Sequence, residues 1–189
     1  MPNSMQSPKL FMLMLGCTPP PRRIEQHDMF FSIADSLKDL KQEILDFWPE
    51  AGEKIHVDAW REVTEVDGYQ IQVVPKGSVP NQTNNLFFMN LGGYKPGEFD
   101  EPHYKMLIVA ADKASAIQQA KQTAFYKHTG FEGATSHIDD KYGVDVDDAF
   151  EIVDVLSEEL KLQYDLKIEL TEGQEKDEIN LGYLKFSKI

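Results

Sequence analysis

The chain has 189 residues, 41% of them hydrophobic and 27% charged, which is a globular composition with room for two small domains. Its 32 acidic residues outnumber 19 basic ones and give a formal net charge of −13, so we expect neither nucleic acid nor an anionic membrane as a partner. The apolar run 10–15 is too short to span a membrane and lacks the basic flank of a secretory signal. We therefore expect a cytoplasmic protein.

Two stretches of the chain repeat one pattern with an offset of 76 residues. Residues 8–36 and 84–112 share eight identities over 29 positions without a gap. An internal repeat takes precedence over local features in predicting a fold. We predict an α/β fold of the α+β type, built from two β-β-α-β-β units with approximate two-fold symmetry. The identical pairs are Leu10/Leu86, Phe11/Phe87, Leu15/Leu91, Gly16/Gly92, Pro20/Pro96, Glu25/Glu101, His27/His103 and Ala34/Ala110.

The first copy is expected to start with a hairpin of strands followed by a helix. A short apolar strand, 10–15, ends at a glycine, and a proline-rich loop leads to a second strand, 29–34. Ser36 then caps a helix whose apolar residues recur at spacings of three and four until Pro49. Two alternating segments around Asp67-Gly68 predict a tight hairpin at the end of the copy.

The second copy follows the same order, but its last part allows two alignments. An offset of 89 pairs EVTEV with EIVDV and predicts a hairpin of strands 150–156 and 164–170, whereas an offset of 81 pairs HVD at 56–58 with HID at 137–139. We prefer the first for the strands. The expected segments are a loose tail 1–9, a first repeat 10–74, a linker 75–85, a second repeat 86–170 and an extension 171–189 with one strand at 181–186.

Four of the five histidines fall in two short patterns beside a carboxylate. In an extended segment, residues i and i+2 point to the same face, so each pair presents two polar side chains together. The second and third strands of each unit are joined by a helical crossover and are therefore parallel, so that they start at one rim, where the glycine loop also lies. The pairs are Glu25/His27, His56/Asp58, Glu101/His103 and His137/Asp139.

Three interpretations of this rim stay open. It can bind a small molecule or anion, with Arg22 and Arg23 on the neighbouring loop and histidine as an acid or base. The same residues can instead brace the loops by hydrogen bonding in a structural or oligomeric interaction module. Two imidazoles with two carboxylates also suit zinc, manganese or iron in a metal-dependent enzyme. Among the functional interpretations we favour the small molecule or anion over a divalent metal, and the sequence does not decide whether the protein is an enzyme.

Three smaller features are interpreted in the same way. Cys17, the single cysteine, excludes an internal disulfide, and we take it as a tolerated small residue in preference to a reactive thiol. The acidic run 145–148 lacks the glycine and glutamate of a calcium loop, so we interpret it as a solvated strand end. A sheet covered by a helix on one face must bury the other, which predicts contact between the halves or a homo-oligomer.

The chain resembles an uncharacterised bacterial family, domain of unknown function 1543, whose members carry one or two tandem copies of a short domain. The resemblance lies in LFMLMLG with the loop to Glu25, in HVDAWREVTEVDGYQI from His56, and in LFFMNLGGY with the loop to Glu101. It spans most of residues 9–170 and implies a two-copy member, without implying an activity. The two copies differ in that Cys17 of the first aligns with Gly93 of the second, and the chain has an acidic end after residue 170.

Overall fold

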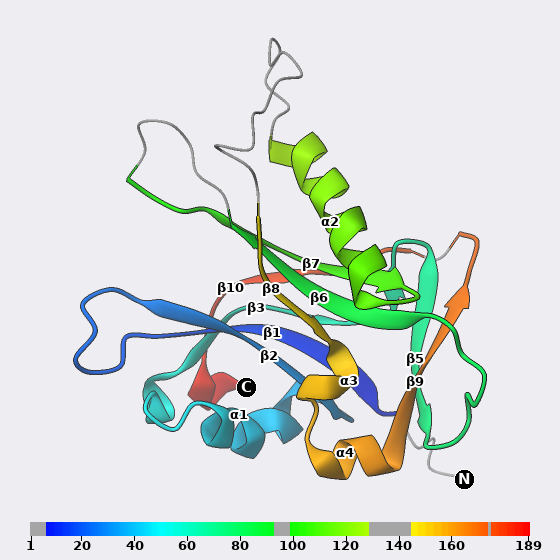
Figure 1. Ribbon diagram of the computed structural model, residues 1–189. Helices are drawn as coiled ribbons and strands as arrows, with labels where there is room; N and C mark the ends of the chain where they lie inside the picture. Colours follow the sequence, from blue (N-terminus) through cyan, green and yellow to red (C-terminus); the bar gives the residue numbers. More distant parts are fainter. Residues whose placement is uncertain (1–6, 93–98, 129–144, 174) are drawn as a thin grey trace, which may run out of the picture. The chain divides into compact units, whose positions relative to one another are not determined.

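A computed structural model describes residues 7–92, 99–128, 145–173 and 175–189 (Figure 1). The contacts divide the chain into two compact units, Met1–Pro80 with Leu156–Ile189, and Asn81–Val155. Each unit contains antiparallel sheet and helix, so the fold is of the α+β type. Within the described residues, no helix is both long enough and apolar enough to cross a bilayer.

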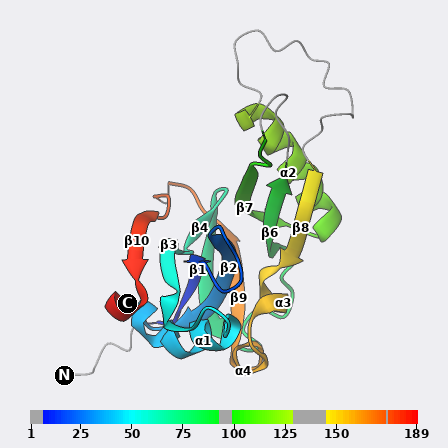
Figure 2. The same cartoon turned by 90° about the vertical axis from the view of Figure 1, so that its left-hand side faces the viewer.

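The main sheet of the first unit has the order β10-β3-β1-β2, with every neighbouring pair antiparallel (Figure 2). Strands β2 and β3 are therefore parallel to each other, as the crossover predicts, but β1 lies between them. The strands are β1 (Lys9–Cys17), β2 (Gln26–Ala34), β3 (His56–Glu62) and β10 (Asn180–Lys185). The crossover contains η1 (Leu37–Leu40), α1 (Lys41–Phe47) and η2 (Gly52–Lys54).

One face of β1 forms the core of this unit beneath η1 and α1. Alternate residues of β1 are buried there, together with Phe30 of β2 and with Leu40 and Ile44 of the helical segment. Cys17 belongs to this core, is 1% exposed, and has a thiol pKa raised chiefly by burial. A raised pKa keeps the thiol protonated, so Cys17 is a packing residue and not an activated nucleophile. Because side chains alternate along a strand, Gly16 faces the opposite side of the sheet from the helix.

A second sheet of the first unit has the order β4-β5-β9. It consists of β4 (Glu65–Val66), β5 (Tyr69–Pro75) and β9 (Tyr164–Leu170), the last preceded by α4 (Glu158–Gln163). Asp67 and Gly68 both have positive φ, at 53° and 84°, which confirms the predicted tight turn between β4 and β5.

The second unit consists of one sheet, β7-β6-β8, covered by α2 (Figure 1). Ala116 and Ala120 of α2 are fully buried against the sheet, where their small side chains let the helix approach closely. The elements are β6 (Asn85–Gly92), β7 (His103–Ala110), α2 (Lys113–His128), β8 (Asp145–Glu151) and α3 (Ile152–Val155).

The hairpin predicted for segments 150–156 and 164–170 is wrong. Strand β8 ends at Glu151 and the next four residues are helical, with Ile152 fully buried, while β9 pairs with β5. The β-branched residues of EIVDV favour a strand locally, but burial of Ile152 in a helical turn overrides that preference. Residues 156–170, expected in the second repeat, therefore belong to the first unit.

One buried carboxylate links the C-terminal extension to the first unit, in addition to the pairing of β10 with β3. The predicted strand at 181–186 is confirmed as β10, and Asp177 precedes it with only 2% of its side chain exposed. The Asp177 carboxylate accepts hydrogen bonds from the backbone N–H and hydroxyl of Thr64 and from the N–H of Glu65. It also lies 3.6 Å from Nη1 of Arg61, whose pKa is lowered chiefly by burial.

We predict that Asp177→Ala lowers the free energy of unfolding of the first unit by roughly 2–4 kcal/mol, because it removes the carboxylate that accepts these part-buried hydrogen bonds and lies beside Arg61. Urea denaturation of the full chain measures the change. The control is Glu178→Ala at the exposed neighbour, expected to change stability by less than about 0.5 kcal/mol. Equal effects of the two substitutions would contradict this role of Asp177.

Candidate functional site

The rim of the first unit is organised around one glycine of the central strand. Gly16 is paired with His27 of β2 on one side and with His56 of β3 on the other. Directly opposed residues of neighbouring strands point to the same face, so both imidazoles lie over the glycine on the side away from α1. Glu25, two residues before His27, is carried to the same place.

A β-bulge brings the fourth side chain into this group. Met14 pairs with Ala59 and Leu15 with Val57, so Asp58 is the extra residue of β3 at that point. Bulges re-aim side chains and are frequent beside functional sites. We call Glu25, His27, His56 and Asp58 the rim cluster.

The four side chains of the rim cluster meet through their terminal atoms. Nε2 of His56 lies 3.0 Å from Oε1 of Glu25 and 3.3 Å from Oδ1 of Asp58. Nε2 of His27 lies 3.2 Å from Oδ2 of Asp58 and 3.6 Å from Oε2 of Glu25. Each imidazole nitrogen is thus near both carboxylates, and each carboxylate contacts the two nitrogens through different oxygens.

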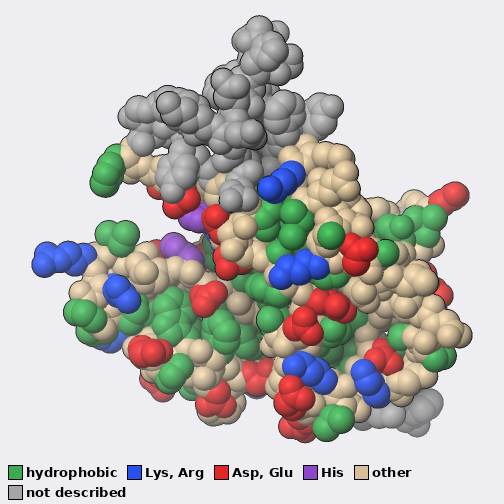
Figure 3. Space-filling view, viewed as in Figure 1, with side chains coloured by type: hydrophobic (Ala, Val, Ile, Leu, Met, Phe, Trp, Pro, Cys, Tyr) green, Lys and Arg blue, Asp and Glu red, His purple; other side chains and the backbone are tan. Residues whose placement is uncertain are grey.

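Two of these atoms are buried without a hydrogen bond to any described residue. They are Nε2 of His56 and Oδ2 of Asp58. The His56 side chain is 5% exposed and that of Asp58 22%, whereas those of His27 and Glu25 are 39% and 44% exposed. The cluster therefore has a dry inner side and an open outer side. The space-filling view shows histidine side chains reaching the surface near acidic ones (Figure 3).

Gly16 leaves the space that the cluster occupies. A Cβ atom at this position would lie 2.5 Å from both Oδ2 of Asp58 and Nε2 of His56, which is closer than real Cβ contacts come. The backbone of Gly16 does not need glycine for its conformation, since its φ is not positive. The site needs it, because any side chain here would displace the inner pair.

An aromatic ring from the C-terminal extension covers the inner histidine. The rings of Tyr183 and His56 have centroids 4.2 Å apart at an interplanar angle of 32°. Strand β10 pairs Leu181 with Ala59 and Leu184 with Val57, so Tyr183 lies in an irregular part of the strand opposite Asp58. Sequence analysis did not find Tyr183, because no motif links the extension to the rim.

The predicted anion-binding arginines do not join the cluster. Arg22 and Arg23 are exposed in the loop between β1 and β2, and neither forms an ion pair with a described residue. Among the described residues, the ion pairs of the four side chains are with one another, and none of the hydrogen bonds described for the chain joins these side chains to a backbone group of the loop. The position of the arginines bears on the interpretation as an anion site, and the contacts of the four side chains bear on the interpretation as a loop brace.

In the second unit, the structure brings together three side chains on the corresponding strands. Ligand atoms of Glu101, His103 and Asp147 all lie within 4.8 Å of one another. His137 and Asp139, predicted to complete this group, lie outside the described residues. Asp147 is a site residue that the sequence analysis did not propose, because it placed the acidic run 145–148 at a solvated strand end. The alignment with an offset of 89 pairs Asp58 with Asp147 and could have identified it.

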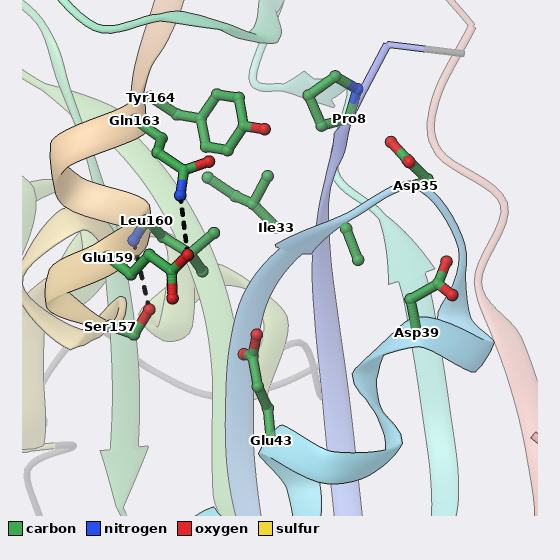
Figure 4. A pocket seen from close by; sticks show the side chains of 11 residues that line it. Pro8, Ile33, Asp35, Asp39, Glu43, Ser157, Glu159, Leu160, Gln163 and Tyr164 are labelled. Carbon is green, nitrogen blue, oxygen red and sulfur yellow. Dashed lines mark hydrogen bonds between the residues drawn. The ribbon is translucent and has the colours of Figure 1, made fainter. Parts of the chain in front are cut away.

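A separate cavity of about 310 Å³ lies at the other end of the β1–β2 pair (Figure 4). None of the described residues that line it is basic, and four are acidic: Asp35, Asp39, Glu43 and Glu159. Three of these carboxylates already accept hydrogen bonds, from Ser36, Ser32 and Gln163. Among the described lining residues, none has a buried polar side-chain atom without a hydrogen-bond partner, in contrast to the rim cluster.

Comparison with known proteins supports the fold and leaves the activity open. The crystal structure of a protein Il1583 from Idiomarina loihiensis is similar with a TM-score of 0.63 and 21% sequence identity, over 95% of this chain and 99% of that one. No curated protein matches the chain. Residues 22–73, which contain the whole rim cluster, match the family model described as Domain of Unknown Function (DUF1543), and this confirms the resemblance over that segment.

Proposed function

We propose that the protein binds a divalent transition-metal ion of the zinc class at the rim cluster of its first unit. The observation that carries the proposal is the environment of His56. Its buried Nε2 lies 3.0 and 3.3 Å from oxygens of two different carboxylates and has no hydrogen bond to a described residue. A buried imidazole nitrogen between two carboxylates is an arrangement that a bound metal ion would satisfy.

The spacing of the four groups supports the same proposal. Metal–ligand bonds of about 2.1 Å place neighbouring ligand atoms about 3.4 Å apart in a tetrahedron and about 3.0 Å apart in an octahedron. The four nitrogen–oxygen distances of the rim cluster run from 3.0 to 3.6 Å, which is close to this range, although they involve both oxygens of Glu25 and both of Asp58. Imidazole with carboxylate is a donor set that zinc, iron and manganese accept.

An ion pair between protonated histidines and carboxylates explains the inner pair less well. A protonated His56 would donate a hydrogen bond from Nε2, yet this atom has no partner of suitable geometry in the described chain. Burial without such a bond costs free energy, whereas a bound cation would satisfy the nitrogen and the carboxylates together. The bracing role is weakened similarly, because the four side chains face one another.

The binding of a free anion is disfavoured by charge. Two carboxylates repel an anion, and Arg22 and Arg23 have no described contact with the cluster. A small ligand fits the site better as a partner of the metal, since a six-coordinate ion held by four protein groups keeps positions for water or a ligand oxygen. The exposed side of His27 and Glu25 would admit such a ligand.

We predict that Zn²⁺ binds the chelator-stripped full chain and raises its melting temperature, and that His56→Gln or His27→Ala weakens the binding at least about a hundredfold. Isothermal titration measures the affinity. Co²⁺ in place of Zn²⁺ gives visible absorption bands that report the coordination.

The matched control is Asp28→Ala, because Asp28 is an exposed carboxylate beside His27 that accepts a hydrogen bond only from the N–H of Met29 among the described residues. This variant should bind Zn²⁺ as the unchanged protein does. The proposal fails if the histidine variants keep full affinity, or if Asp28→Ala reduces it equally.

We also predict that Gly16→Ala weakens Zn²⁺ binding at least about tenfold while the protein stays folded, because the new methyl group overlaps His56 and Asp58 and not the backbone. Circular dichroism checks the fold and titration the affinity. Gly92→Ala, at the corresponding position of the second unit, is the control. Undiminished affinity in Gly16→Ala would show that the metal does not lie over this glycine.

A homo-oligomer and a cytoplasmic location stay predictions beside this proposal, and so does the exclusion of nucleic acid and membrane. The net charge of −13 supports the last of these. None of them is required for metal binding at the rim cluster.

A further inference from the structure

We infer that the second unit contains an independent cation site of different selectivity, formed by Glu101, His103 and Asp147, which takes a hard divalent ion of the manganese class. The three side chains come from the start of β7, the loop before it and β8. Nε2 of His103 lies 3.1 Å from Oδ2 of Asp147, and one ligand atom of each residue lies within 4.8 Å of the other two.

The backbone at this site has the register found at the rim cluster. Gly92 pairs with His103 on one side and with Asp145 on the other, and the register of β6 and β8 shifts between Asn90 and Leu91, so that Asp147 is the extra residue of β8. A Cβ atom at Gly92 would overlap the Asp147 carboxylate. The three side chains are therefore placed by the backbone: the bulge directs Asp147 toward the site, and Gly92 leaves room for its carboxylate.

The donor set is richer in oxygen than that of the first unit. Asp145 stands at the register position that His56 holds there, so the second unit has one histidine where the first has two. Asn90 stands where the first unit has Met14, and its buried Oδ1 has no hydrogen-bond partner among the described residues. Carboxylate and carbonyl oxygens favour Mn²⁺, Mg²⁺ or Ca²⁺, and the imidazole of His103 favours Mn²⁺ among these.

The exposure of the site fits a hydrated ion. The side chains of His103 and Asp147 are both 35% exposed, against 39% for His27 and 22% for Asp58 at the corresponding positions of the first unit. Hard cations give up their water reluctantly and are commonly held by a few protein ligands with several waters. Three protein groups on an open rim meet that requirement.

The test uses the chelator-stripped full chain and Mn²⁺ alone as the probe. Electron paramagnetic resonance measures the concentration of free Mn²⁺ and so gives the affinity. The broadening of backbone amide signals in NMR spectra locates the bound Mn²⁺. We expect one bound Mn²⁺ that broadens the signals of residues 91–92, 103 and 146–147. His103→Gln and Asp147→Asn should each weaken Mn²⁺ binding at least about tenfold and leave the Zn²⁺ affinity unchanged.

The reverse variants separate this inference from the proposal for the first unit. His56→Gln should weaken Zn²⁺ and leave Mn²⁺ in place, and Gly92→Ala should weaken Mn²⁺ alone. Broadening centred on residues 15–16, 27 and 57, or full Mn²⁺ affinity in His103→Gln and Asp147→Asn, overturns the second site. If those variants lose Mn²⁺ and no Zn²⁺ binds in the first unit, this inference stands. The proposal of Zn²⁺ binding at the rim cluster is then overturned.

Discussion

The missing side chain at the end of a central strand is the constraint on which the candidate site depends. In a sheet of order β2-β1-β3, the two outer strands start at the same rim and are separated by about 10 Å, two strand spacings. Side chains of His27 and His56 can meet across that distance only over the strand between them. Gly16 leaves that space, and a methyl group there would lie 2.5 Å from the inner pair.

The free energy needed to bury these polar groups is the physical reason for proposing a ligand at the rim cluster. Two carboxylates and two imidazoles meet at this centre, and part of the group is buried. Buried carboxylates are stable when a cation or hydrogen-bond donors compensate them. Nε2 of His56 makes no hydrogen bond of suitable geometry with the described residues. A bound cation would compensate the four groups without such bonds, which is the reason for proposing a metal in place of simple ion pairing.

Sequence analysis could predict the parts of the site that follow from topology. The crossover between β2 and β3 places Glu25, His27, His56 and Asp58 at one rim, and the structure finds them there. It could not predict Tyr183, whose position depends on the pairing of β10 with β3 across more than 100 residues of sequence.

In the second half of the chain, residue type and backbone register select different residues. The pattern HID at 137–139 matches HVD at 56–58 in residue type and lies outside the described residues, whereas Asp145 and Asp147 match His56 and Asp58 in register. Asp147 could therefore be found by register and not by residue type. The strand predicted at 150–156 was wrong because it was based on the local sequence pattern, and alternation alone does not show which partner strand is present.

The strand next to the site contributes to the difference in side-chain exposure between Asp58 and Asp147. In the first unit β10 pairs with β3, and its Tyr183 covers the ring of His56. In the second unit β8 is the last strand of its sheet within the described residues, and Asp147 is more exposed than Asp58. In the proposed first site, two imidazoles, one of them covered, would favour a cation that accepts nitrogen and sheds water, whereas the proposed second site, with more oxygen donors, would favour one that keeps its water. One backbone arrangement would then bind two kinds of ion, because the neighbouring strand and one residue of the outer strand differ.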